Sequence, residues 1–246
     1  MTYCVGMMLD KGLVLMSDTR TNSGVDNISV FRKMFTWQEP GERMITVMTA
    51  GNLASTQAVV SQLEERMKEP GERENILFEA PTMFNVATEI GKLLRSTIGE
   101  RQSANGARGQ GKFTASIIVA GQIRGREPRL FMGYPEGNFI EASLDTPFFQ
   151  IGETKYGRPI LVRAYDPMMT FEEAMKLLLV SFDSTVKANL SVGAPFDFHF
   201  YEADSLVQGH SGRIEQDDPY FTQVSEGWSD ALKQALVSLP DYDGDV

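Results

Sequence analysis

The sequence has 246 residues, 42% of them hydrophobic and 23% charged, which is typical of a soluble protein long enough to bury a sizeable core. Its 33 acidic residues outnumber the 23 basic ones, and the formal net charge of -10 argues against a surface for nucleic acid or for an anionic membrane. The single cysteine, Cys4, excludes an intramolecular disulfide. Because the chain shows no signal-peptide pattern and no apolar stretch long enough to span a membrane, we expect a cytoplasmic protein.

The chain starts with two short segments, residues 3–9 and 13–17, that are apolar on both faces. Such segments predict strands of a sheet that is covered on both sides. Between them, residues 10–12 (DKG) favour a hairpin with a three-residue loop that ends on glycine. In that hairpin Leu9 lies opposite Leu13.

The same register predicts which side chains meet near the start of the chain. Cys4 lies opposite Asp18 and Thr2 opposite Arg20, so these four side chains share one face of the sheet. Asp18 is then a diagonal neighbour of Thr2, and a carboxylate at the end of a buried strand needs a partner. Lys33, at the start of the next strand, is a lysine that can supply it.

The rest of the chain alternates between strands and helices. Strands are expected at residues 33–37, 43–50, 112–123, 129–135, 137–143, 147–152 and 195–205. Helices are expected at residues 53–69, 82–101, 154–164, 170–190 and 225–239, two of them capped by Asn52 and Thr170.

This order of elements favours an α+β fold, a four-layer αββα sandwich of two packed antiparallel sheets flanked by helices. No break in composition marks a linker. We therefore expect one domain over residues 1–246, with a C-terminal extension over residues 208–246.

Thr2 becomes a candidate nucleophile if Met1 is removed, because Thr2 then carries both a hydroxyl and a free α-amine. An α-amine has an ordinary pKa of about 7.7–8.0, so it can accept the hydroxyl proton as the oxygen attacks a carbonyl. A nearby Lys33 ammonium would disfavour a second positive charge on that amine. Asp18 would hold Lys33 in place.

These residues resemble the proteasome β-subunit family of N-terminal nucleophile (Ntn) hydrolases. The resemblance rests on Thr2, on SDTR with Asp18, on RKMF with Lys33 and on MTAGNLAS around Gly51, in this order and spacing. The threonine directly after Met1, the absence of a propeptide and the extra C-terminal segment are most similar to the bacterial Anbu (ancestral beta subunit) branch.

The resemblance implies a threonine-type peptidase. Thr2 would be the nucleophile, Asp18 and Lys33 its charge partners, and the backbone N–H of Gly51 would stabilise the oxyanion. Further residues would contact the substrate backbone or shape its pocket, namely Thr21, Asn22, Phe31, Thr49 and Leu53. The resemblance also implies self-association into a ring or an open spiral. No cofactor or metal is expected, and no site for an ATPase partner is evident.

Two positions depart from the family's pattern. Glu153 stands where the family has a serine after a glycine, and Ala188 stands three residues before Ser191, where the family has an aspartate. Asn189 lies alongside. In the family the aspartate and serine at this place support the amine of the nucleophile. The departures therefore bear on the rate and the substrate. Ser191 stays a candidate site residue.

Two alternatives therefore remain open beside the peptidase. One is an Ntn amidase that acts on small amides or short modified peptides. The other is a catalytically weak assembly scaffold of the same fold.

Two further patterns argue against other chemistry. Residues 106–112 (GARGQGK) match a phosphate loop as far as the lysine, but Phe113 follows where serine or threonine should bind magnesium, and the loop precedes a strand instead of a helix. The two histidines, His199 and His210, lack a metal-ligand spacing and have no cysteine partner, so a zinc site is not expected.

Overall fold

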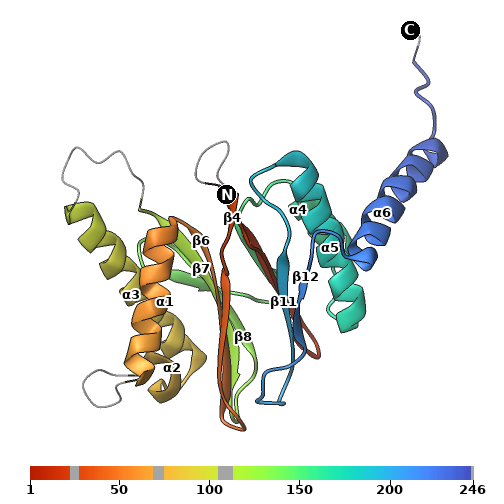
Figure 1. Ribbon diagram of the computed structural model, residues 1–246. Coiled ribbons are helices and arrows are strands. Elements are labelled where there is room, and N and C mark those ends of the chain that lie inside the picture. The colour runs from red at the N-terminus through yellow and green to blue at the C-terminus, as the bar shows by residue number, and fades with distance from the viewer. Residues whose placement is uncertain (23–27, 69–74, 105–112, 245–246) are drawn as a thin grey trace.

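The computed structural model describes residues 1–22, 28–68, 75–104 and 113–244, and it has four layers (Figure 1). One antiparallel sheet has the order β10 (Phe148–Gly152), β1 (Tyr3–Leu9), β2 (Gly12–Asp18), β11 (Phe196–Glu202) and β12 (Ser211–Ile214). The other has the order β5 (Met34–Glu39), β6 (Arg43–Gly51), β7 (Ala115–Ile123), β8 (Arg129–Gly133) and β9 (Phe139–Glu141).

Helices cover the outer face of each sheet. One helix layer consists of α1 (Leu53–Lys68), α2 (Ile76–Glu79) and α3 (Met83–Ala104), and the other of α4 (Arg158–Ala164), α5 (Phe171–Ala188) and α6 (Pro219–Ser238). A separate two-stranded ribbon is formed by β3 (Arg20–Asn22) and β4 (Ile28–Val30). The predicted αββα sandwich is confirmed. The elements α2, β3, β4 and β12 were not expected from the sequence.

The first hairpin corrects the predicted register by one residue. Leu9 pairs with Gly12 and Cys4 with Ser17, so the loop has two residues instead of three. Gly12 lies inside β2 at φ 146°, where an added Cβ would collide with the backbone oxygen of Tyr201 on β11. The glycine therefore permits close approach of a neighbouring strand and does not end the turn.

Three hydrophobic clusters hold the layers together. The cluster between the two sheets contains Cys4, Leu15, Met48, Ile118 and nine other buried residues. The other two lie between each sheet and its helices. Cys4 is fully buried in this cluster, and burial raises the pKa of its thiol, so Cys4 is a core residue.

Helix caps follow the sequence closely. The side chain of Asn52 accepts a 3.1 Å hydrogen bond from the backbone N–H of Ser55, at the start of α1. Thr170 and Glu173 form a capping box at the start of α5. Both caps satisfy backbone N–H groups that a helix start leaves unpaired.

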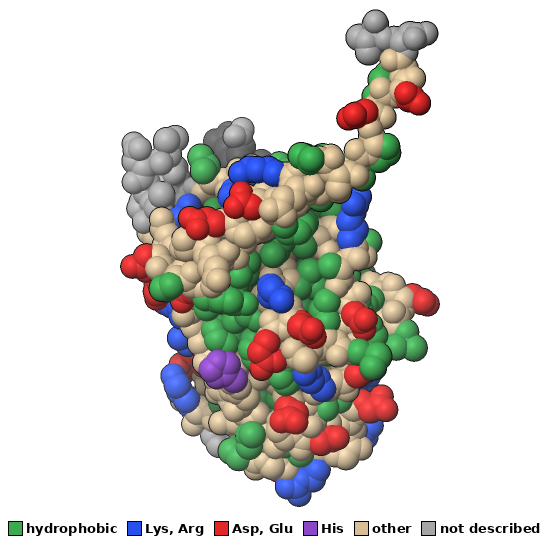
Figure 2. Space-filling view, turned by 90° about the vertical axis from the view of Figure 1, so that its right-hand side faces the viewer, with side chains coloured by type: hydrophobic (Ala, Val, Ile, Leu, Met, Phe, Trp, Pro, Cys, Tyr) green, Lys and Arg blue, Asp and Glu red, His purple; other side chains and the backbone are tan. Residues whose placement is uncertain are grey.

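The C-terminal helix α6 packs against α5 at one corner of the sandwich, and the chain beyond it projects away from the body (Figure 1). Figure 2 looks onto this side of the molecule and shows hydrophobic side chains at the surface. Val162 of α4, Met168 and, on α6, Leu236 and Val237 are among the exposed ones. None of the helices in the described part of the chain is long and apolar enough to cross a membrane.

Truncation of the cluster between the sheets should cost more than truncation at the surface. We expect Leu15→Ala to lower the free energy of unfolding by about 2–5 kcal/mol, because Leu15 is fully buried and its loss leaves a cavity. Leu144→Ala, at a position 96% exposed, should change it by less than about 0.5 kcal/mol. Urea unfolding followed by circular dichroism measures both. Equal losses would contradict the assignment of this cluster as the core.

Candidate active site

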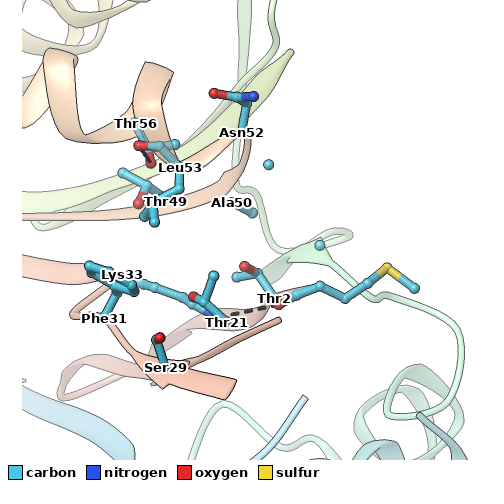
Figure 3. A pocket seen from close by; sticks show the side chains of 13 residues that line it. Thr2, Thr21, Ser29, Phe31, Lys33, Thr49, Ala50, Asn52, Leu53 and Thr56 are labelled. Atoms are coloured by element: carbon cyan, nitrogen blue, oxygen red, sulfur yellow. Dashed lines mark hydrogen bonds between the residues drawn. The ribbon is translucent and has the colours of Figure 1, made fainter. Parts of the chain in front are cut away.

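The N-terminus of the chain lies at a cavity of about 620 Å³ between the sheets and the ribbon of β3 and β4. Most residues that the sequence singles out line it: Thr2, Thr21, Phe31, Lys33, Thr49, Gly51 and Leu53. In Figure 3, Thr2, Lys33 and Thr21 lie across the cavity from Thr49 and Leu53. Met1, Ser29, Ala50, Asn52, Thr56 and Gly152 complete the lining.

Two predicted residues are placed differently. Asn22 belongs to β3 and pairs with Ile28 through the backbone, but its side chain is outside the described part of the structure. Ser191 is not among the residues that line the cavity. The stretch 106–112, which resembles part of a phosphate loop, also falls outside the described residues.

A buried ion pair forms the base of the site. The Lys33 Nζ lies 2.7 Å from Oδ1 of Asp18, and both side chains are almost fully buried. Oδ1 also accepts a 2.9 Å hydrogen bond from the backbone N–H of Tyr3, while Nζ donates to the carbonyl of Arg20 at 2.7 Å. Burial raises the pKa of Asp18 above its usual range, and the Lys33 ammonium and the Tyr3 N–H oppose that shift.

The predicted meeting of Asp18 with Lys33 is thus found, although the face argument behind it is wrong. With the register shifted by one residue, Cys4 points into the cluster between the sheets, opposite Ser17. Asp18 is instead the last residue of β2 and accepts a hydrogen bond from the backbone N–H of Tyr3. From this strand end its carboxylate contacts Lys33.

Thr2 is held by its backbone. Its carbonyl accepts a 2.7 Å hydrogen bond from the N–H of Glu153, and the Thr2 residue is only 8% exposed. Gly152 lies against this carbonyl at φ 87°, where an added Cβ would collide with the Thr2 oxygen. The glycine at position 152 therefore permits the close approach of the Thr2 backbone.

Met1 lies over the same site. Its carbonyl accepts a 3.4 Å hydrogen bond from the Lys33 Nζ. The pKa of the Met1 amine is lowered from 8.0, first by burial and then by the Lys33 charge, while Asp18 acts in the opposite direction. An amine at this place is thus more easily neutral than one in water.

Gly51 ends β6 on the far side of the cavity, immediately before the cap of α1. It has φ 111°, a conformation that favours glycine. Asn52 and Leu53 follow in the turn from strand to helix and also line the cavity. The backbone N–H of Asn52 donates to the carbonyl of Thr114 at 3.0 Å, so it is already paired.

Of the two positions that depart from the family's pattern, Glu153 contacts Asn189, the residue next to Ala188. The Asn189 side chain donates a 3.0 Å hydrogen bond to the carboxylate of Glu153 and accepts one of 3.0 Å from the backbone N–H of Ser191. Glu153 is the residue whose N–H holds the Thr2 carbonyl. Asn189, at the end of α5, therefore links Glu153 to Ser191. In the sequence, its position beside Ala188 was the one sign of this role.

Comparison with known proteins identifies relatives of the whole chain. The family model described as "Proteasome subunit" matches residues 2–197. Anbu (ancestral beta-subunit) from Yersinia bercovieri is 44% identical, with 98% of this chain and 100% of that chain covered and a TM-score of 0.90. An Anbu mutant from Hyphomicrobium sp. is 48% identical, with 99% and 100% covered and a TM-score of 0.90.

A third solved structure is described as the helical assembly of the Anbu complex from Pseudomonas aeruginosa. Its chain is 41% identical to this one, with 98% of each chain covered and a TM-score of 0.91. No curated protein matches the sequence.

Removal of Lys33 should destabilise the fold in a pH-dependent way. Lys33→Met leaves the buried Asp18 carboxylate without its cation, which should cost about 3–5 kcal/mol of unfolding free energy at pH 7. The pKa of Asp18 is already raised and should rise further, so the folded state binds the proton more tightly than the unfolded one. Stability is therefore regained as pH falls through the raised pKa towards 3.8.

Urea unfolding of the variant at several pH values measures this effect. Adding Asp18→Asn to Lys33→Met should recover most of the loss at pH 7. Lys92→Met, which breaks an exposed ion pair with Glu89, should cost less than about 1 kcal/mol. A loss at Lys33→Met that does not depend on pH would contradict the role given to Asp18.

Proposed function

Because this chain belongs to the proteasome subunit family, in its Anbu branch, we propose that it is an N-terminal-threonine amide hydrolase that cleaves peptides. Thr2 is the proposed nucleophile after Met1 has been removed. The observation that carries the proposal is the place of Thr2 in a cavity beside the buried pair of Asp18 and Lys33. The Lys33 ammonium already contacts the carbonyl of the bond that must be cut, that of Met1.

The first proposed step forms an ester. The Thr2 hydroxyl oxygen attacks the substrate carbonyl carbon, and its proton passes to the free Thr2 amine. That amine then protonates the leaving nitrogen as the amide bond breaks. The pKa of the Met1 amine at this site is lowered by burial and by Lys33, and we propose that the same two causes act on the Thr2 amine once Met1 has been removed, which favours its role as a base. Asp18 keeps Lys33 in place.

The second proposed step releases the acyl group. The amine takes a proton from water, the hydroxide attacks the ester, and the Thr2 hydroxyl is restored. In both steps negative charge develops on the substrate oxygen. We assign its stabilisation to the N–H of Gly51, at the cavity rim where β6 gives way to α1.

The substrate would lie along the cavity between β3 and the end of β6. Thr21 would contact its backbone, with Asn22 beside it, and Phe31, Thr49 and Leu53 would shape the pocket for a side chain. These three residues make a pocket of mixed polarity, which suits a peptide and also a small amide. A small amide or a short modified peptide is therefore the second candidate substrate.

The Glu153–Asn189 contact favours a second function, that of a catalytically weak scaffold. Where the family's pattern has a serine and an aspartate, this chain has Glu153 and Ala188, and the amide of the neighbouring Asn189 contacts the Glu153 carboxylate. Ser191 would take part in the site through this contact, because its N–H donates to Asn189. In either function we propose that the chain associates with copies of itself in a ring or an open spiral, and the exposed apolar residues of α4 and α6 support this.

Exposure of Thr2 is the decisive requirement. We expect the protein purified from its own host to lack Met1, and incubation with a peptide epoxyketone to add one inhibitor mass at Thr2. The epoxyketone reacts with both the hydroxyl and the amine of an N-terminal threonine, so the adduct reports the proposed pair. Intact mass and peptide mapping measure both events.

Thr2→Ala should abolish the adduct, whereas Thr222→Ala, at an exposed position on α6, should leave Thr2 reactive. A Met1 that is fully retained would disprove the free-threonine mechanism for that form. An exposed Thr2 that reacts with neither peptide nor small-amide probes would favour the scaffold. A panel of peptides and small amides then separates the two candidate substrates.

The amine should set the acid side of the activity profile. A protonated amine cannot accept the hydroxyl proton, so kcat/KM should fall as pH drops through the pKa of the amine. Burial and the Lys33 charge lower the pKa of the Met1 amine. We expect the same two causes to act on the Thr2 amine after removal of Met1, so the midpoint should lie below 8.0. Amide hydrolysis measured from pH 5 to pH 9 tests this, and Thr2→Ser should keep the midpoint, since the titrating group is unchanged. A midpoint at or above 8.0 would contradict the assignment.

A further inference from the structure

A second cavity, of about 400 Å³, lies at the edge of the sandwich between the edge strands β5 and β12. One wall comes from Arg32, Met34 and Thr36, and the other from residues of β11 and β12 and from Gln208. It shares no residue with the cavity of Thr2. Its chemistry is therefore independent of the proposed hydrolysis.

A buried imidazole lines this cavity. His199 is 1% exposed, and its Nδ1 lies 3.1 Å from the hydroxyl of Thr46. Its Nε2 is buried and has no hydrogen-bond partner among the described residues. Burial lowers the pKa of His199 to about 4, so the ring is neutral at neutral pH. A buried polar atom left without a partner is costly, and it indicates a group that is completed by a bound molecule.

Hydroxyl groups next to the ring are compatible with a proton on Nε2. The Thr46 hydroxyl lies 3.1 Å from Nδ1 of His199, 2.9 Å from the Thr36 hydroxyl and 3.5 Å from the Met44 sulfur. When Thr46 donates its proton to Nδ1, the proton of the neutral ring is on Nε2. In that tautomer Nε2 carries a buried N–H donor.

The charges that line the cavity favour an anion. Arg213 forms two hydrogen bonds to Asp197, at 2.7 and 3.0 Å, so these two charges compensate one another. The guanidinium of Arg32 has no carboxylate partner among the residues that the structure describes. One positive charge is left over, in a chain whose formal net charge is -10.

We propose that this cavity binds a small oxyanion, a carboxylate or a phosphate, through the Arg32 guanidinium and the His199 Nε2–H. The planar fork of a guanidinium matches the paired oxygens of either group. The hydroxyl of Ser211 and the amide of Gln208 are further polar groups in the same cavity. The Nε2–H gains the acceptor that the protein itself does not provide.

The full-length protein labelled with nitrogen-15 at histidine tests this site directly. It contains two histidines, and His210→Gln assigns the remaining ring to His199. Inorganic phosphate and, in a second arm, citrate are titrated at constant ionic strength. We expect the free His199 ring to show the Nε2–H tautomer and its Nε2 signal to shift saturably with at least one anion.

Arg32→Gln should weaken the affinity at least tenfold, because it removes the uncompensated charge. Arg163→Gln, at an exposed position on α4, is the matched control and should not change it. A response to citrate alone assigns a carboxylate, one to phosphate alone a phosphate, and one to both an oxyanion in general. The proposal is overturned if neither anion gives a saturable shift, if both arginine variants weaken binding equally, or if the proton lies on Nδ1.

Discussion

The ion pair between Asp18 and Lys33 is the contact on which the site depends. It joins the end of a strand in one sheet to the segment that leads into the edge strand of the other. Burial of two charges is costly, and it is offset here by the short contact and by backbone partners on both sides. Because one of these partners is the N–H of Tyr3, the same carboxylate also holds the chain start in place.

The chain start is fixed from the other direction as well. The N–H of Glu153 holds the Thr2 carbonyl, and Gly152 allows the close approach of the two backbones. The Glu153 side chain is in turn hydrogen-bonded to Asn189, at the end of α5. Thr2 therefore shares its cavity with Lys33, while its carbonyl is held by the backbone N–H of Glu153.

The segment before β5 serves two cavities at once. Phe31 and Lys33 line the cavity of Thr2, whereas Arg32 and Met34 line the one at the edge of the sandwich. Extended backbone sends successive side chains to opposite sides, so a single segment divides the two spaces. A bound anion at Arg32 would lie one residue away from the lysine that holds Asp18.

Hydrophobic pattern and cap residues in the sequence were enough to determine the layers and most of the helices. The meeting of Asp18 with Lys33 followed from the need of a buried carboxylate for a partner, although the predicted register was wrong by one residue. Register, close approach and bridging contacts were decided only by the tertiary structure. The sequence does not reveal that Gly12 lies against β11, that Asn189 contacts Glu153 or that His199 lines a cavity at the edge of the sandwich. The physical reason is range: propensity and periodicity act between neighbours along the chain, whereas these contacts join residues that only the packing of two sheets brings together.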